Sequence, residues 1–335
     1  MTSRFGAGSS LRRSMLVLLI VALATALALG LRPHAEKLLG AVRAMDARWL
    51  LPALGLCVLH RLVNSLGWTM VLWAMGRPLP ARTGARIWLA SEAFRWLPGS
   101  VWAYGSRGVL AARAGIPPAV AAASLIWELL ITVLAWASVA ALALGCWAGP
   151  IPPAIEAAGR SLVDRPWMST LGVAAAALVA VLVGSKALGR KLSRLSESGA
   201  SFRRFRVDGP GFLRVYSFHL AMVLANGGIF WLVLRAAPGG DRCTVAVALA
   251  ANSIAWLAGL FAVFAPGGLV VREATIAVLL SGAMPPEQAF TVALAWRAVQ
   301  VAAEVGGTLA ILPGGPDRSP GEWTETRVLA KGIEA

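Results

Sequence analysis

The sequence predicts an all-α, polytopic membrane protein with about six full transmembrane helices and two re-entrant helical hairpins. Three observations lead to this fold class: an apolar composition, repeated apolar runs of membrane-spanning length, and two Pro-Gly pairs inside apolar segments. Of the 335 residues, 58% are hydrophobic and 14% are charged, whereas a soluble domain carries roughly 25% charged residues. This excess of apolar surface requires lipid as its solvent and excludes a soluble globular fold.

Six apolar runs are long enough to cross a hydrocarbon core of about 30 Å, which takes roughly 20 helical residues. They cover residues 15–31, 48–75, 117–147, 167–184, 213–235 and 286–312. A further apolar segment, 245–264, either spans the membrane or forms one arm of a hairpin, because a Pro-Gly pair follows it. The first run also has the features of a signal peptide, but we expect a retained anchor because it continues to Leu31 and more spans follow.

The net charge of +15 is concentrated in loops, so it indicates membrane topology and not nucleic-acid binding. The loop 185–212 holds seven basic residues against two acidic ones. The positive-inside rule places this loop in the cytoplasm together with the N-terminal tail, residues 1–14. We therefore expect a multi-pass protein of the cell (plasma or inner) membrane with a cytoplasmic N-terminus. An alternative role for the basic loop is binding to anionic lipid headgroups.

An internal duplication is indicated by two proline patterns with the same spacing. Both Pro-Gly pairs precede a Pro-Pro pair by 19 residues, and the copies are offset by 168 residues: Pro98-Gly99 with Pro117-Pro118, and Pro266-Gly267 with Pro285-Pro286. We expect one membrane domain, 15–312, made of repeats 15–147 and 167–312 and followed by a tail, 313–335. If each hairpin returns to its own side, the second repeat is inverted; if 245–264 crosses fully, the repeats are parallel.

Each Pro-Gly pair marks a candidate binding site, because a broken helix leaves backbone groups that lipid cannot satisfy. Such a break persists only beside protein or water. We expect helices to restart at Ser100 and Gly268, with free N–H groups and the positive dipole end directed toward the membrane interior, where they suit a phosphate or carboxylate. The alternative is that the pairs only kink two spans for packing.

Charged residues inside the apolar segments point to the same region, since each costs about 2.5–3.5 kcal/mol at the bilayer centre unless it is paired or hydrated. Arg297, Gln300 and Glu304 share one face of the last span. We expect arginines to hold a phosphate and glutamates to balance them in the empty site; interhelical ion pairs that only fix packing are the alternative. The predicted substrate-binding residues are Pro98, Gly99, Ser100, Arg107, Glu128, Pro266, Gly267, Gly268, Arg272, Glu273, Arg297 and Glu304.

The two breaks also carry a family resemblance. The run RWLPGSVW at 95–102, with Arg107 and Glu128 after it, resembles the "KYIPGGVW…R" signature of the lysylphosphatidylglycerol synthase transmembrane region. The run APGGLVVRE at 265–273 resembles that family's "PGGxGxRE" motif, and Arg297 matches an arginine usual in its last span. The resemblance covers about residues 45–312. The sequence departs from the family at Arg95, where Lys is frequent, and at Val270, where Gly is frequent.

The resemblance implies that residues 15–312 form a flippase-like domain, which in the best-known members moves an aminoacylated phospholipid between leaflets. Because 23 residues follow residue 312, we expect the stand-alone branch without an aminoacyl-transferase domain. The predicted function is movement of an anionic phosphate-bearing lipid, either a phospholipid or a polyprenyl-phosphate-linked one, between leaflets. We expect no cofactor, no catalytic residues and no metal site, because HExxH, Walker A and GxSxG motifs are absent.

Two other functions stay open at this point. One is a membrane-embedded accessory subunit or enzyme of lipid-linked glycan or lipid modification, working with a partner lipid-modifying enzyme or glycosyltransferase. The other is a scaffold that binds lipid without moving it.

Overall fold

The structure is a computed structural model that describes residues 40, 43–96, 102–147, 207–262 and 265–309. Within these ranges every regular element is a helix, and no strand is present, as the sequence predicts. The chain divides into two compact units, 1–45 and 46–335, and all the helices below belong to the second. The expected spans 15–31 and 167–184, both tails and most of the loop 185–212 lie outside the described residues.

The second unit opens with a first set of helices. They are α3 (Ala47–Asn64), α4 (Gly67–Ala74), α5 (Ala81–Glu92), the 3₁₀ turn η2 (Ala93–Trp96), α6 (Trp102–Arg113) and α7 (Pro118–Gly145). Asp46 caps α3, and the hydrogen bond from the backbone N–H of Arg48 holds the pKa of this carboxyl below its usual value. Pro118 opens α7 in the first turn, where a missing N–H breaks no helical bond.

A second set of helices follows from Gly209. They are α11 (Gly209–Ala236), η4 (Gly240–Arg242), α12 (Val245–Phe261), η5 (Pro266–Gly268), α13 (Val271–Leu280) and α14 (Pro286–Leu309). Two of these helices have side-chain N-caps: Asp208 accepts from Gly211 N at 2.9 Å, and Thr244 Oγ1 accepts from Val247 N at 3.3 Å.

Among the described residues, three helical stretches of 28 residues are long and apolar enough to cross a membrane: Ala47–Ala74, Pro118–Gly145 and Gly209–Ala236. They correspond to the predicted spans 48–75, 117–147 and 213–235. The first of them is not a single rod, because a turn at Ser65 and Leu66 separates α3 from α4. The expected span 286–312 forms α14 over 24 residues, but this helix is not one of the three. Segment 245–264 forms the shorter α12, with 17 residues.

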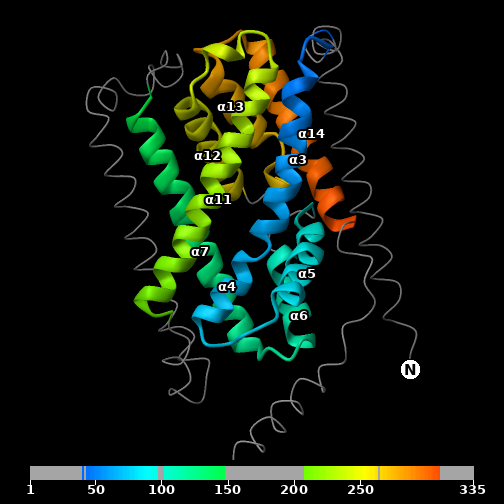
Figure 1. The fold of residues 1–335 in the computed structure, drawn as a ribbon, viewed down its shortest axis with the longest axis vertical. Coiled ribbons are helices and arrows are strands. Elements are labelled where there is room, and N and C mark those ends of the chain that lie inside the picture. Colours follow the sequence, from blue (N-terminus) through cyan, green and yellow to red (C-terminus); the bar gives the residue numbers. More distant parts are fainter. Residues whose placement is uncertain (1–39, 41–42, 97–101, 148–206, 263–264, 310–335) are drawn as a thin grey trace, which may run out of the picture. The chain divides into compact units, whose positions relative to one another are not determined.

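The helix pairing of the first set recurs in the second. Helix α5 packs on α6 and α6 on α7, just as α12 packs on α13 and α13 on α14. Helix α3 contacts α14, α11 contacts α7, and α3 and α11 contact each other. This pattern agrees with a duplication in which α3, α5, α6 and α7 correspond to α11, α12, α13 and α14. The hairpins α5–α6 and α12–α13 lie toward opposite ends of the unit (Figure 1), while η2 contacts η5.

Tryptophans anchor the packing around the centre of the unit. Trp68 on α4 is fully buried and donates from Nε1 to Ser124 Oγ on α7 at 2.9 Å. Trp136 on α7 and Trp256 on α12 stack with ring centroids 4.8 Å apart. These contacts join α7 to α4 of the first set and to α12 of the second, and Trp136 and Trp256 both line the cavity described next.

Candidate functional site

The structure describes the second of the two predicted breaks, while the first lies outside the described residues. The first helix run ends at Trp96 and α6 begins at Trp102; Pro98, Gly99 and Ser100 between them lie outside the described residues. At the second break, Gly267 has φ 57° and Gly268 has φ 69°, a left-handed conformation that glycine adopts without strain. Helix α13 restarts at Val271, so the expected restart at Gly268 is wrong by three residues. The reason is that Val270, with φ 70° and ψ −46°, is not helical, so the helix begins only at the next residue.

Val270 is the single non-glycine residue with positive φ among the described residues, at φ 70° and ψ −46°. A β-branched side chain in this region clashes with its own backbone. This is also the position at which the sequence departs from the glycine usual in the resembling motif. The strain therefore lies beside Arg272, at the start of α13.

Replacing Val270 with glycine should stabilise the protein by about 1 kcal/mol, because the strain of a left-handed β-branched residue is removed. Thermal unfolding in detergent micelles measures the effect. Val278→Gly is the matched control: Val278 is 45% exposed inside α13, so the glycine should destabilise there by roughly 0.5–1 kcal/mol. Equal losses for both variants would show that the backbone at Val270 is not strained.

A cavity of about 210 Å³ lies where the two sets of helices meet. Its walls come from α3, α5, η2, α6, α7, α11, α12, η5, α13 and α14. The charged lining residues are Arg61, Glu92, Arg95, Arg107, Glu128, Arg272 and Glu304, and four aromatic side chains join them: Trp88, Tyr104, Trp136 and Trp256. One water molecule needs roughly 10–15 Å³ on such a measure, so the cavity has room for a polar headgroup.

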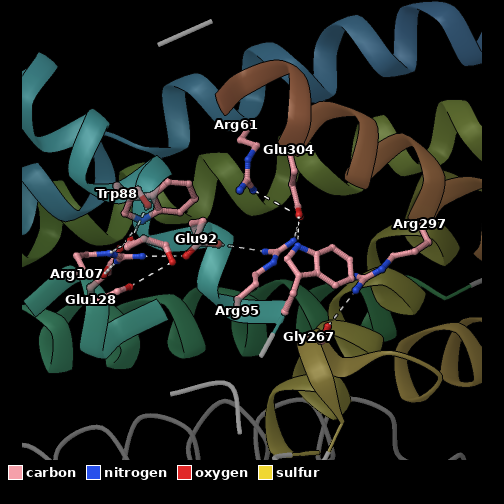
Figure 2. Close-up of polar contacts among 12 residues, drawn as sticks. Arg61, Trp88, Glu92, Arg95, Arg107, Glu128, Gly267, Arg297 and Glu304 are labelled. Atoms are coloured by element: carbon pink, nitrogen blue, oxygen red, sulfur yellow. Dashed lines mark hydrogen bonds and ion pairs between the residues drawn. The ribbon is translucent and has the colours of Figure 1, made fainter. Parts of the chain in front are cut away.

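An unbroken chain of alternating charges crosses the cavity (Figure 2). It runs through Glu128, Arg107, Glu92, Arg95, Glu304 and Arg61. Glu92 sits in the middle, with Oε1 2.9 Å from Arg107 Nη2 and Oε2 3.2 Å from Arg95 Nη1. Because the signs alternate, each charge in this chain has at least one partner of opposite sign, which is the condition under which charges persist away from water.

Arg107 is the most buried member of this chain, with a relative exposure of 2%. Besides its two carboxylate partners, Glu92 and Glu128, it donates from Nε to Ser91 Oγ at 2.9 Å. Its guanidinium also lies 5.3 Å from the centroid of the Trp88 ring. The charge of Arg107 is thus fully compensated by the protein.

Glu304 on α14 connects the two sets of helices. It pairs with Arg95 of η2 and, at 3.7 Å, with Arg61 of α3. Trp96 donates from Nε1 to Glu304 Oε2 at 3.1 Å. One carboxylate near the end of the second set therefore holds the residues immediately before the first break.

Arg297 stabilises the second break in a similar way. Its Nη2 donates to the carbonyl oxygen of Gly267 at 3.4 Å, and its Nε lies 3.6 Å from Glu273 Oε1 (Figure 2 shows the contact with Gly267). Its guanidinium also lies 4.7 Å from the ring centroid of Trp96. Arg297 thus satisfies a carbonyl that the broken helix leaves unpaired and contacts both breaks at once.

Arg272 differs from the other arginines, because it forms neither an ion pair nor a hydrogen bond with any residue that the structure describes. Its Nε is buried without a partner, and its guanidinium lies 5.9 Å from the Trp256 ring centroid. It lines both the large cavity and a smaller one beside Arg297 and Glu273. Arg272 is therefore the uncompensated cation of the described site.

The predicted site residues come together only in part. Arg107, Glu128, Gly267, Arg272 and Glu304 line the large cavity, while Glu273 and Arg297 line the smaller one. Gly268 packs against Arg272. Pro266 is in η5, with no side-chain position described.

Sequence reasoning missed Glu92 as a site residue, although it sits at the centre of the charge chain. A signal was available: Glu92 is an acidic residue in an apolar segment, six residues before Pro98, and the cost of burying a carboxylate applies there as it does to Glu128.

Comparison with known proteins adds one match. A family model described as "Lysylphosphatidylglycerol synthase TM region" matches residues 14–305. No curated protein shows significant similarity to the chain. The match includes both breaks and every cavity residue named above.

Proposed function

Because the chain belongs to the lysylphosphatidylglycerol synthase transmembrane family and contains helices suited to cross a membrane, we propose that it is a lipid flippase. The proposed substrate is an anionic, phosphate-bearing lipid, either a phospholipid or a polyprenyl-phosphate-linked one. The observation that carries the proposal is the charged cavity beside the broken helices, where guanidinium groups gather among apolar spans. A cavity of this kind lowers the cost of bringing a charged headgroup away from water.

In this proposal the headgroup enters the cavity while the acyl or prenyl chains stay in the bilayer. The hairpins α5–α6 and α12–α13 are re-entrant and enter from opposite faces, so that the repeats are inverted. Support comes from the recurring helix pairing, from the placement of the hairpins toward opposite ends, and from the contact between η2 and η5. The site would open to one leaflet and then the other as one repeat moves against its partner.

A reconstituted transport assay tests the proposal. The full-length protein in vesicles should speed the appearance of labelled phospholipid or polyprenyl phosphate in the opposite leaflet, compared with protein-free vesicles. Thr132→Trp on α7 should slow this movement at least about tenfold, because Thr132 lines the cavity and the indole would occupy headgroup space. The initial rate of loss of signal after adding a membrane-impermeant quencher measures the movement.

Val133→Trp is the matched control, since it adds the same ring one position along α7, outside the cavity lining. It should keep most of the rate. If the wild-type protein moves no lipid, the flippase proposal is wrong. Chemical change of the headgroup without movement between leaflets would instead support a membrane-embedded enzyme or accessory subunit.

A further inference from the structure

The charges around the cavity do not cancel. Four arginines and three glutamates line it in the described part of the chain, and each glutamate pairs with at least one arginine other than Arg272. The smaller adjoining cavity adds Arg297 and Glu273, which lie close enough to compensate each other. With the histidines neutral, one positive charge is left over, and the geometry places it on Arg272.

Two glycines leave the room that the Arg272 side chain occupies. A Cβ on Gly259 of α12 would lie 2.4 Å from Arg272 Nε and 2.5 Å from its Cγ, and one on Gly268 would lie 2.8 Å from Nε. The side chain therefore passes through a slot that only residues without a side chain leave open. Gly259 is buried in the last turn of α12, two residues before the helix ends at Phe261, so the slot lies at the end of α12 that precedes the second break.

The slot directs Arg272 toward the space that a headgroup would fill. Gly259, Gly267 and Arg272 all belong to the lining of the large cavity, and the indole of Trp256 covers one side of the guanidinium. A guanidinium without a carboxylate partner, next to a void, matches the oxygens of a phosphate and never loses its charge.

We propose that the cavity selects lipids whose headgroup carries one net negative charge as a phosphodiester, with the phosphate on Arg272 and with Gly259 and Gly268 as the positioning residues. This inference rests on the proposed flippase function. A phosphodiester neutralises the single excess charge. A zwitterionic headgroup has a cation of its own and therefore leaves the excess positive charge of the site in place. A phosphomonoester carries a charge of about −1.5 to −2 at pH 7, which exceeds the single positive charge that the described site offers.

The test compares three acyl-labelled lipids in vesicles that hold the full-length protein: phosphatidylglycerol with one negative charge, zwitterionic phosphatidylcholine, and phosphatidic acid as the phosphomonoester. The wild type should move phosphatidylglycerol fastest. Arg272→Gln should lower that rate about tenfold and lower the phosphatidylcholine rate less, because the choline cation already offsets the phosphate of that lipid, so that the preference is lost. Arg272→Lys, which keeps the charge, should retain a preference for phosphatidylglycerol.

Gly259→Ala tests the positioning role, because the added methyl group displaces Arg272 without removing its charge. It should reduce the preference for phosphatidylglycerol over phosphatidylcholine severalfold. Gly228→Ala on α11 is the matched control, since a Cβ there meets nothing within 4 Å, and it should leave the preference intact.

A binding measurement distinguishes failure of this inference from failure of the flippase proposal. Short-chain phosphatidylglycerol should raise the thermal unfolding midpoint of the detergent-solubilised wild type but not of Arg272→Gln. If phosphatidylglycerol stabilises the wild type in this way but the protein moves no lipid, the flippase proposal is wrong and the inferred charge selection stands. If the wild type moves all three lipids at equal rates, or Arg272→Gln keeps the preference, the inference is overturned while the flippase proposal stands.

Discussion

Replacing Arg107 with glutamine should lower the free energy of unfolding by about 3–5 kcal/mol, the usual loss when one partner of a buried ion pair is removed. The arginine is 2% exposed and compensates two carboxylates, those of Glu92 and Glu128. Without it, Glu128 retains only the hydrogen bond from Trp88 Nε1, 2.9 Å from its Oε1, among the described residues. Denaturant-induced unfolding in detergent micelles measures the loss.

The exposed Arg113 at the end of the same helix supplies the control, and Arg113→Gln should change stability by less than about 1 kcal/mol. Glu128→Gln combined with Arg107→Gln should cost less than the sum of the two single changes, because the double variant no longer buries an unpaired Glu128 carboxylate. Additive losses would contradict the ion pair as the source of stability.

Glu304→Gln should cost about 1.5–3 kcal/mol and loosen the contact between η2 and α14. The carboxylate pairs with Arg61 and Arg95 and accepts from Trp96 Nε1. An uncharged amide no longer compensates the two guanidinium groups, although Arg95 keeps its pair with Glu92. The expected loss is therefore smaller than for Arg107.

Hydrogen exchange provides the specific measurement for this change. Amides of η2 (Ala93–Trp96) should exchange faster in Glu304→Gln, because the side chains that hold η2 to α14 lose their shared partner. Glu287→Gln, at the exposed start of the same helix α14, should leave exchange in η2 unchanged. Faster exchange in both variants would show a general loosening of α14 and not the loss of this connection.

The ion pairs assign different roles to the arginines that sequence reasoning treated alike. Arg107 and Arg297 are compensated by carboxylates and hold helices or the broken backbone in place. Arg272 has no carboxylate partner in the described part of the chain and is the residue on which we place the phosphate. Substitutions at Arg107 should therefore act mainly through stability, and those at Arg272 mainly through lipid preference.

At the second break, local backbone chemistry predicts an interruption of the helix but not the residue at which the next helix begins. Proline cannot donate a helical hydrogen bond and glycine adopts positive φ freely, so Pro266-Gly267 predicts a break, and α12 does end at Phe261, five residues before Pro266. The place where α13 restarts was missed by three residues, because Val270 takes a conformation that its own side chain disfavours. Packing beyond the local sequence imposes such a conformation, so local propensity does not reveal it.

The membrane class, the helical character, the second break and the shared face of Gln300 and Glu304 follow from the sequence alone, because hydropathy, backbone chemistry and helical periodicity act over a few residues. Tertiary structure decided which charges cancel. Glu304 lies 209 residues from Arg95, and no local pattern shows that they pair. The identity of the unpaired cation depends on these long-range partnerships, so Arg272 is singled out only once the helices are packed.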